Sequence, residues 1–177
     1  MTSDLLDLYA SASDWTVGKV AGVRDLDAAT PCEEWQARDL LNHMLETQRY
    51  FVAAARGEDA SPPGPTPPEV LSDDPKRDFE RARADVIETF SQEGVVDKTG
   101  PALGIAFADM LLHGYDVARA TGQDATMPDG LAEAAYNTIH GRFTDEQRKG
   151  VFKPEIPVGT DASPQQRLLA YTGRDPS

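Results

Sequence analysis

Apolar residues recur at intervals of three and four along much of this chain, a spacing typical of one face of an α-helix. The pattern first covers about Ser3 to Val23, and it returns from near Gln36 to Arg56, where Gly57 ends it as glycine commonly ends helices. Before this second segment, Thr30 to Glu33 has the order of a capping box with proline at the first helical position. Strand-type alternation persists nowhere in the sequence, so the pattern predicts an all-α protein.

The second half of the pattern predicts the remaining elements. Helices are expected from near Lys76 to Gln92, from about Leu103 to Thr121 and from near Asp129, with a last helical turn between Gln165 and Tyr171. Six prolines lie between Pro62 and Pro75, a density that excludes both helix and strand pairing. We expect an irregular surface crossing there, more mobile than the helices. The prediction is a single domain over residues 1–177, an up-down four-helix bundle with an extra C-terminal helical segment.

Charge and cysteine content narrow the classes of partner. The chain has 30 acidic and 17 basic residues among 177, a net charge of −13, which disfavours nucleic acid and anionic membrane surfaces as partners. It has neither a secretory signal nor an apolar run of the roughly 18 to 20 residues needed to span a bilayer. Cys32 is the only cysteine, so we expect a reducing compartment. These features predict a cytoplasmic monomer or homodimer that binds a small molecule.

Two of the three histidines belong to a pattern that fits a metal site. Asp109 and His113 are four residues apart, so both side chains lie on one stripe of a predicted helix, and Asp116 continues that stripe as a possible acceptor for a ring N–H. His43 lies midway along another predicted helix, among apolar neighbours. Two facing helices could thus supply His, Asp and His to one divalent ion and leave a coordination position open, as catalytic sites do. The alternatives are a hydrogen-bonded core histidine and a simple surface pair.

Three stretches resemble one known family. The first is Thr30 to His43, TPCEEWQARDLLNH, and the second is Asp109 to Gly122, DMLLHGYDVARATG. The third is Leu168 to Pro176, LLAYTGRDP. Together they are similar to an actinobacterial DinB-like metal-binding family related to the N-terminal domain of mycothiol-dependent maleylpyruvate isomerase. The resemblance covers nearly the whole chain.

The resemblance implies a DinB-like bundle with a metal bound by His43, Asp109 and His113. Zinc is the first expectation for this ligand set, with nickel or iron able to occupy the same ligands. The implied activity is that of a metal-dependent transferase or isomerase that joins a thiol such as mycothiol to a small electrophile. Arg38 and Arg119, which belong to the motifs, are candidates for binding the cofactor's polar end. The alternative is a non-catalytic metal-binding or small-molecule-binding bundle.

One residue departs from the family's pattern, and one residue of the first stretch has more than one candidate role. The isomerase has a glutamate where this chain has Asp109, and the shorter side chain would draw an ion nearer the helix. Cys32 could be a fourth ligand or a nucleophile, but a small buried packing role is favoured for a single cysteine beside a helix start.

Overall fold

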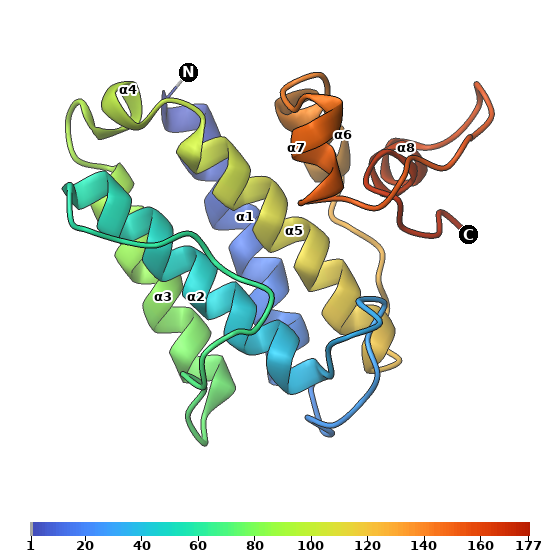
Figure 1. Cartoon of the computed structure of the whole chain (residues 1–177), viewed down its shortest axis with the longest axis horizontal. Helices are drawn as coiled ribbons and strands as arrows, with labels where there is room; N and C mark the ends of the chain where they lie inside the picture. Colours follow the sequence, from blue (N-terminus) through green and yellow to red (C-terminus); the bar gives the residue numbers. More distant parts are fainter. Residues whose placement is uncertain (1) are drawn as a thin grey trace.

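The computed structural model describes residues 2–177 and is helical throughout its regular parts (Figure 1). Within that range the helices are α1 (Thr2–Ala21), α2 (Ala37–Arg56), α3 (Pro75–Phe90), α4 (Val95–Thr99), α5 (Ala102–Ala120), α6 (Leu131–Ile139), α7 (Asp145–Lys149) and α8 (Pro164–Tyr171). The described residues form no strand, and one isolated β-bridge joins Ala29 to Gln36. The predicted all-α class is confirmed.

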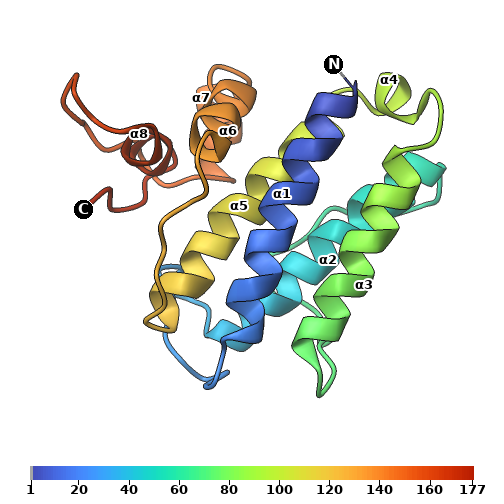
Figure 2. The same cartoon turned by 180° about the vertical axis from the view of Figure 1, so that it is seen from behind.

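The four long helices α1, α2, α3 and α5 form a bundle (Figures 1 and 2). Helix α5 packs against α1 and α2, and α3 packs against the other side of the same two helices. The chain between α2 and α3 runs back along α2, so α2 and α3 point the same way, opposite to α1 and α5. Successive long helices reverse direction except at this step, where the order departs from the predicted up-down bundle because the proline-rich crossing returns the chain to the end at which α2 begins.

Large apolar side chains from all four long helices fill the centre of the bundle. The largest fully buried ones are Tyr9, Phe79, Phe90, Phe107, Leu40, Leu41, Met44, Leu45, Leu103, Met110 and Leu111, and Ile139 of α6 is buried as fully. Helices α1 and α5 approach closely at Gly114, where a β-carbon would collide with Thr16 and Trp15. The Thr16 hydroxyl also donates to the carbonyl of Met110 at 3.0 Å. This close contact fixes the position of α5 along the axis of α1.

Helix α2 begins at Ala37, next to the predicted start near Gln36, but its capping residues differ from the sequence prediction. The capping box predicted at Thr30 to Glu33 is wrong, because the helix begins at Ala37 and the backbone N–H of Gln36 donates to the Asp39 carboxylate at 3.0 Å. The Thr30 hydroxyl instead accepts from the Cys32 N–H at 3.1 Å and lies 2.7 Å from the carbonyl of Trp35. Local side-chain bonds of this kind favour a turn over a helix.

The proline-rich crossing is irregular, as predicted. Residues 58–74 contain no helix or strand, and Pro75 becomes the first residue of α3. The buried side chain of Asn42 on α2 accepts from the backbone N–H groups of Val70 and Leu71, both at 2.8 Å. Nearer its middle, the carbonyl of Pro65 accepts from the indole N–H of Trp35 at 3.0 Å. Greater mobility of this crossing stays a prediction.

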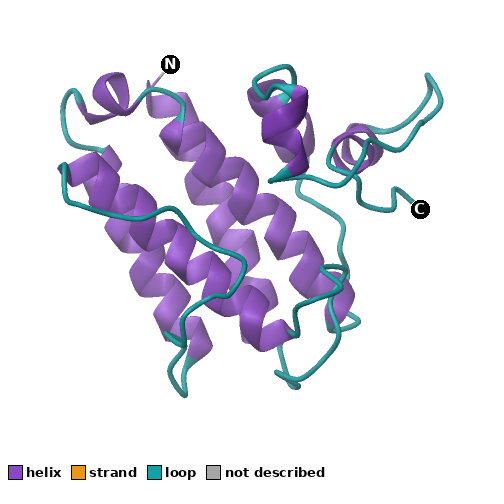
Figure 3. Cartoon of the chain, in the orientation of Figure 1, coloured by secondary structure: helices purple, strands orange, loops and turns teal. Residues whose placement is uncertain are grey.

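The C-terminal segment adds helices to one side of the bundle, and α4 and α7 are further short helices that the sequence pattern did not predict (Figure 3). Helix α6 packs against both α5 and α8 and also touches α1, so the chain after α5 is joined to the bundle mainly through α5. Among the described residues, no helix combines the length and the apolar character that crossing a membrane requires.

Candidate metal centre

Helices α2 and α5 bring His43, Asp109 and His113 together. One ligand atom from each of the three side chains lies within 4.8 Å of the other two. The two imidazole rings are 5.1 Å apart between centroids and nearly perpendicular, and Oδ1 of Asp109 lies 3.4 Å from Nε2 of His113. The side chains of His113 and Asp109 keep 13% and 19% of their surface exposed, so the group is not fully enclosed by protein.

Helix geometry explains why these three side chains converge. Residues four apart lie on one face of a helix, which places Asp109 directly above His113 on α5. On α2, Leu40 and Met44 are buried and turn the adjoining face toward α5. The ring of Trp35, in the loop before α2, lies 4.6 Å from that of His43 and forms one wall of the group.

A buried carboxylate determines which nitrogen of His113 faces the group. Oδ2 of Asp116, which has no exposed surface, lies 3.0 Å from Nδ1 of His113. An ionised carboxylate only accepts hydrogen bonds, so Nδ1 carries the proton and Nε2 is turned toward Asp109. Arg174, after α8, donates from Nε to Oδ1 of Asp116 at 2.9 Å and from Nη2 to Oδ2 at 2.8 Å.

Two buried atoms of the group lack hydrogen-bond partners among the described residues. They are Nδ1 of His43 and Oδ2 of Asp109. Buried polar atoms without partners are costly, and nearly all such atoms in folded proteins are satisfied. Lone pairs on imidazole and carboxylate are what a divalent transition metal takes as ligands. The residues present therefore fit the ion that the sequence motifs imply.

The pKa values of these three side chains also suit the binding of a divalent ion. Burial and the neighbouring His113 lower the pKa of His43 to about 4, so its ring is neutral near pH 7. Burial would raise the pKa of Asp109, but the facing His113 keeps it below its ordinary value. Burial would lower the pKa of His113, yet the carboxylates of Asp109 and Asp116 raise it to about 9. Without an ion, protonated His113 and Arg174 together balance the carboxylates of Asp109 and Asp116.

Comparison with known proteins places this group in a family. The sequence profile of the mycothiol maleylpyruvate isomerase N-terminal domain matches residues 9–118, a range that includes all three side chains. The chain belongs to this family. Two proteins of Mycobacterium tuberculosis, from strains CDC 1551 / Oshkosh and ATCC 25618 / H37Rv and both described as uncharacterized, are each 28% identical over 189 residues. The alignment covers 97% of this chain and 98% of each relative. No solved structure matches significantly.

Membership of the mycothiol maleylpyruvate isomerase N-terminal family confirms the resemblance stated from the motifs. It makes the chain a mycothiol-related, DinB-like helical domain. The profile match stops at residue 118, whereas Arg174 lies 56 residues beyond that point. Arg174, which binds the Asp116 carboxylate beside His113, therefore lies outside the matched range.

Cys32 lies near the group, beside the Asp116 carboxylate. Its Sγ is 3.9 Å from Oδ2 of Asp116, and Cys32, Asp116 and His113 also offer ligand atoms within 4.8 Å of one another. Burial and the Asp116 carboxylate raise the pKa of the Cys32 thiol to about 11, which keeps it protonated. Asp116 is also held by Arg174 on both oxygens. This arrangement agrees with a packing role for Cys32.

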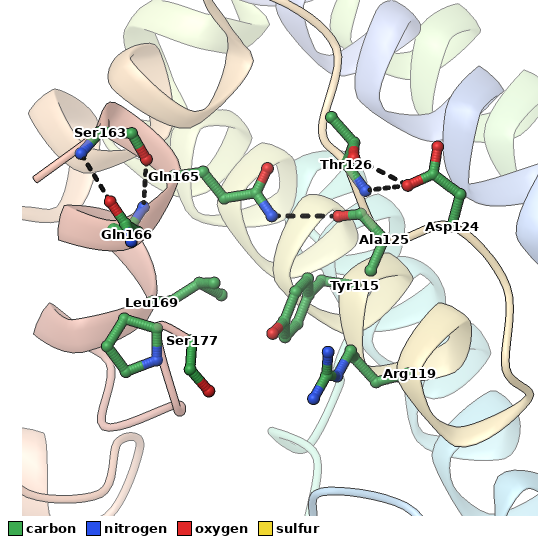
Figure 4. Close-up of a pocket in the computed structure, with 11 residues that line it drawn as sticks. Tyr115, Arg119, Asp124, Ala125, Thr126, Ser163, Gln165, Gln166, Leu169 and Ser177 are labelled. Carbon is green, nitrogen blue, oxygen red and sulfur yellow. Dashed lines mark hydrogen bonds between the residues drawn. The ribbon is translucent and has the colours of Figure 1, made fainter.

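The two candidate arginines lie outside the three-residue group. Arg38 is exposed in the first turn of α2, and Arg119 is exposed in the last turn of α5. Arg119 borders a pocket of about 490 Å³ between the end of α5, residues 124–126, α8 and the final residues of the chain (Figure 4). None of the three proposed metal ligands lines this pocket. A cofactor-binding role for Arg38 or Arg119 stays a prediction.

Sequence reasoning missed two residues of this region. Trp35 received no role in the site, yet it is half-buried and its ring stands against that of His43. Arg174 received no role, although it falls within the third stretch of family resemblance. That stretch, Leu168 to Pro176, was the one available signal, and it did not say which residue Arg174 contacts.

Proposed function

We propose that this protein is a divalent-metal-dependent transferase or isomerase that acts on a small electrophile with the help of a low-molecular-weight thiol of the mycothiol type. The observation that carries the proposal is the convergence of His43, Asp109 and His113 with two of their buried polar atoms unpartnered. A satisfied core cluster would pair these atoms within the protein. Membership of a mycothiol-related family supports the choice of thiol.

The three side chains divide the work of holding an ion. His43 is neutral near pH 7 because burial lowers its pKa, so it offers a lone pair without losing a proton. Asp109 supplies the negative charge, and its pKa is held below the ordinary value by His113. His113 presents Nε2 because Asp116 accepts at Nδ1. Three protein ligands leave a coordination position open, and the partial exposure of the group gives access to it.

The chemistry follows from that open position. A divalent ion bound there would hold a thiol as its thiolate, the nucleophile needed to form a sulfur–carbon bond with an electrophile. The group's own residues exclude part of the solvent, since Trp35 covers one side of His43. Zinc suits two imidazoles and one carboxylate, and nickel or iron can take the same ligands.

The test is turnover measured with and without metal. The purified protein is analysed for bound metal, stripped with a chelator, and reloaded with zinc, nickel or iron. Each form is then assayed for conjugation of mycothiol, and of other small thiols, to a panel of small electrophiles. We expect one ion per chain and turnover that disappears on stripping and returns on reloading.

Two results would contradict this proposal in different ways. Stoichiometric metal without turnover of any thiol would leave a non-catalytic binding bundle, the rival function. A protein that binds none of the three ions above background would remove the metal centre itself.

A further inference from the structure

Arg174 forms the outer end of a three-residue chain that leads to a proposed metal ligand. Its guanidinium makes two nearly parallel hydrogen bonds to Asp116, from Nε to Oδ1 at 2.9 Å and from Nη2 to Oδ2 at 2.8 Å. Oδ2 of Asp116 also lies 3.0 Å from Nδ1 of His113. Asp116 has no exposed surface and Arg174 keeps 15% of its side chain exposed, so water competes little for these bonds.

Two-point contact fixes the carboxylate more firmly than a single charge can. A guanidinium that binds both oxygens sets the plane of the carboxylate as well as its position. With that plane fixed, the remaining lone-pair direction of Oδ2 points to one place, the Nδ1–H of His113. A lysine at position 174 would keep the charge but offer a point contact, which leaves the carboxylate free to turn. The orientation of the His113 ring thus depends on the fork geometry of Arg174.

We propose that Arg174 is a positioning residue of the metal centre, acting on His113 through Asp116. This inference rests on the proposed function, because it concerns the ligand set assigned there. The three ligands all lie within residues 9–118, the range matched by the family profile, and Arg174 follows α8. The C-terminal segment therefore completes a centre whose ligands lie elsewhere in the chain.

A second arginine of the same segment provides a matched control. Arg148 donates from Nη2 to the carbonyl of Tyr171 at 2.7 Å, and its guanidinium lies over the Tyr171 ring at 4.3 Å. It therefore holds α8 as Arg174 does, but through Tyr171 and not through Asp116. Changes at Arg148 should loosen the segment without turning the His113 ring.

The first experiment measures zinc affinity by competition with a chromogenic chelator. We expect Arg174→Ala and Arg174→Lys to weaken zinc binding by about 10- to 100-fold, the usual range for a residue that orients a ligand. Arg148→Ala and Arg148→Lys should stay within about twofold of the wild type. In an Asp116→Ala background, Arg174→Ala should add less than about twofold, because residues that act through one another are not additive. Equal losses at Arg148 and Arg174, or an undiminished loss in the Asp116→Ala background, would overturn the proposal.

The second experiment works on metal-free protein. An imidazole N–H bonded to a buried carboxylate exchanges slowly with water and gives a separate downfield proton resonance, assigned to His113 by its loss in His113→Gln. We expect this resonance to persist in Arg148→Lys and to broaden or vanish in Arg174→Lys, the milder variant that serves if Arg174→Ala does not fold. An unchanged resonance in Arg174→Lys overturns the positioning role. Should the wild type bind none of zinc, nickel and iron, the proposed function fails, and this resonance still decides how Arg174 acts on His113.

Discussion

The candidate metal centre and the pocket between α5 and α8 share one helix but differ in how their polar groups are used. In the pocket the polar groups satisfy one another, as where Asp124 accepts from Thr126 and where Ser163 and Gln166 bond reciprocally. The pocket has a volume of about 490 Å³. At the centre, by contrast, buried Nδ1 of His43 is left without a partner. Buried lone pairs without partners therefore indicate a ligand site better than empty volume does.

The largest effect should come from removing one ligand at the centre. His113→Ala leaves two ligands, so metal affinity should fall by more than the roughly 100-fold typical of changes around a ligand. The variant should purify essentially free of metal and remain helical, because the core of the bundle is apolar and does not depend on the ion. Metal analysis and circular dichroism measure the two outcomes.

His140→Ala is the control for that variant. His140 is exposed at the end of α6, where its ring stacks on Tyr136 at 4.7 Å, and it takes no part in the centre. Its removal should leave metal content unchanged. Wild-type metal content in His113→Ala would mean that the ligands are wrongly assigned, and joint loss of metal and helix would mean that the centre is structural.

Acidity should weaken metal binding in a graded way, by a smaller amount for each pH unit than the removal of a ligand does. The pKa of His113 is raised to about 9 and that of His43 is lowered to about 4, so near pH 7 only His113 must lose a proton to bind an ion. Binding should release about one proton, and affinity should fall about tenfold for each pH unit below 9, more steeply once His43 protonates near 4. Calorimetry in buffers of different ionisation enthalpy measures the released proton. Binding without proton release would refute this account of His113.

The smallest effect should come from the pocket. Arg119→Ala should leave metal affinity within about twofold, because Arg119 lines the pocket and not the centre. If its guanidinium binds the polar end of the thiol, the KM for the thiol should rise by at most about tenfold, since an exposed charge is screened by water. The same assay on Arg38→Ala tests the other candidate arginine. A large loss of metal in Arg119→Ala would show that pocket and centre are coupled.

Helical periodicity in the sequence was enough to predict most of the long helices. The predicted end of the second helix at Gly57 matches the structure, where Gly57 has the left-handed conformation that a terminating glycine allows. The short helices α4 and α7 were not predicted because five residues are too few to display a 3.6-residue period. The capping box at Thr30 failed because the same residue types also stabilise turns.

Local residue spacing predicted part of the candidate site but none of its long-range contacts. It placed Asp109, His113 and Asp116 on one stripe of one helix, which is a local property of the chain. The pairing of Arg174 with Asp116 joins residues 58 positions apart, and no periodicity encodes such a contact. The metal-binding role of the three ligands remains a prediction. Neither residue spacing nor the family motifs identify the substrate.

The wall beside His43 is made by loops. Trp35 belongs to the loop before α2, and its indole N–H is bonded to Pro65 in the proline-rich crossing. Loops accept insertions and substitutions far more readily than packed helices do. Divergence within such a lineage can therefore reshape the mouth of the centre residue by residue while α2 and α5 stay constant. In evolutionary terms, the reactivity would be inherited with the helices and the choice of substrate with the loops.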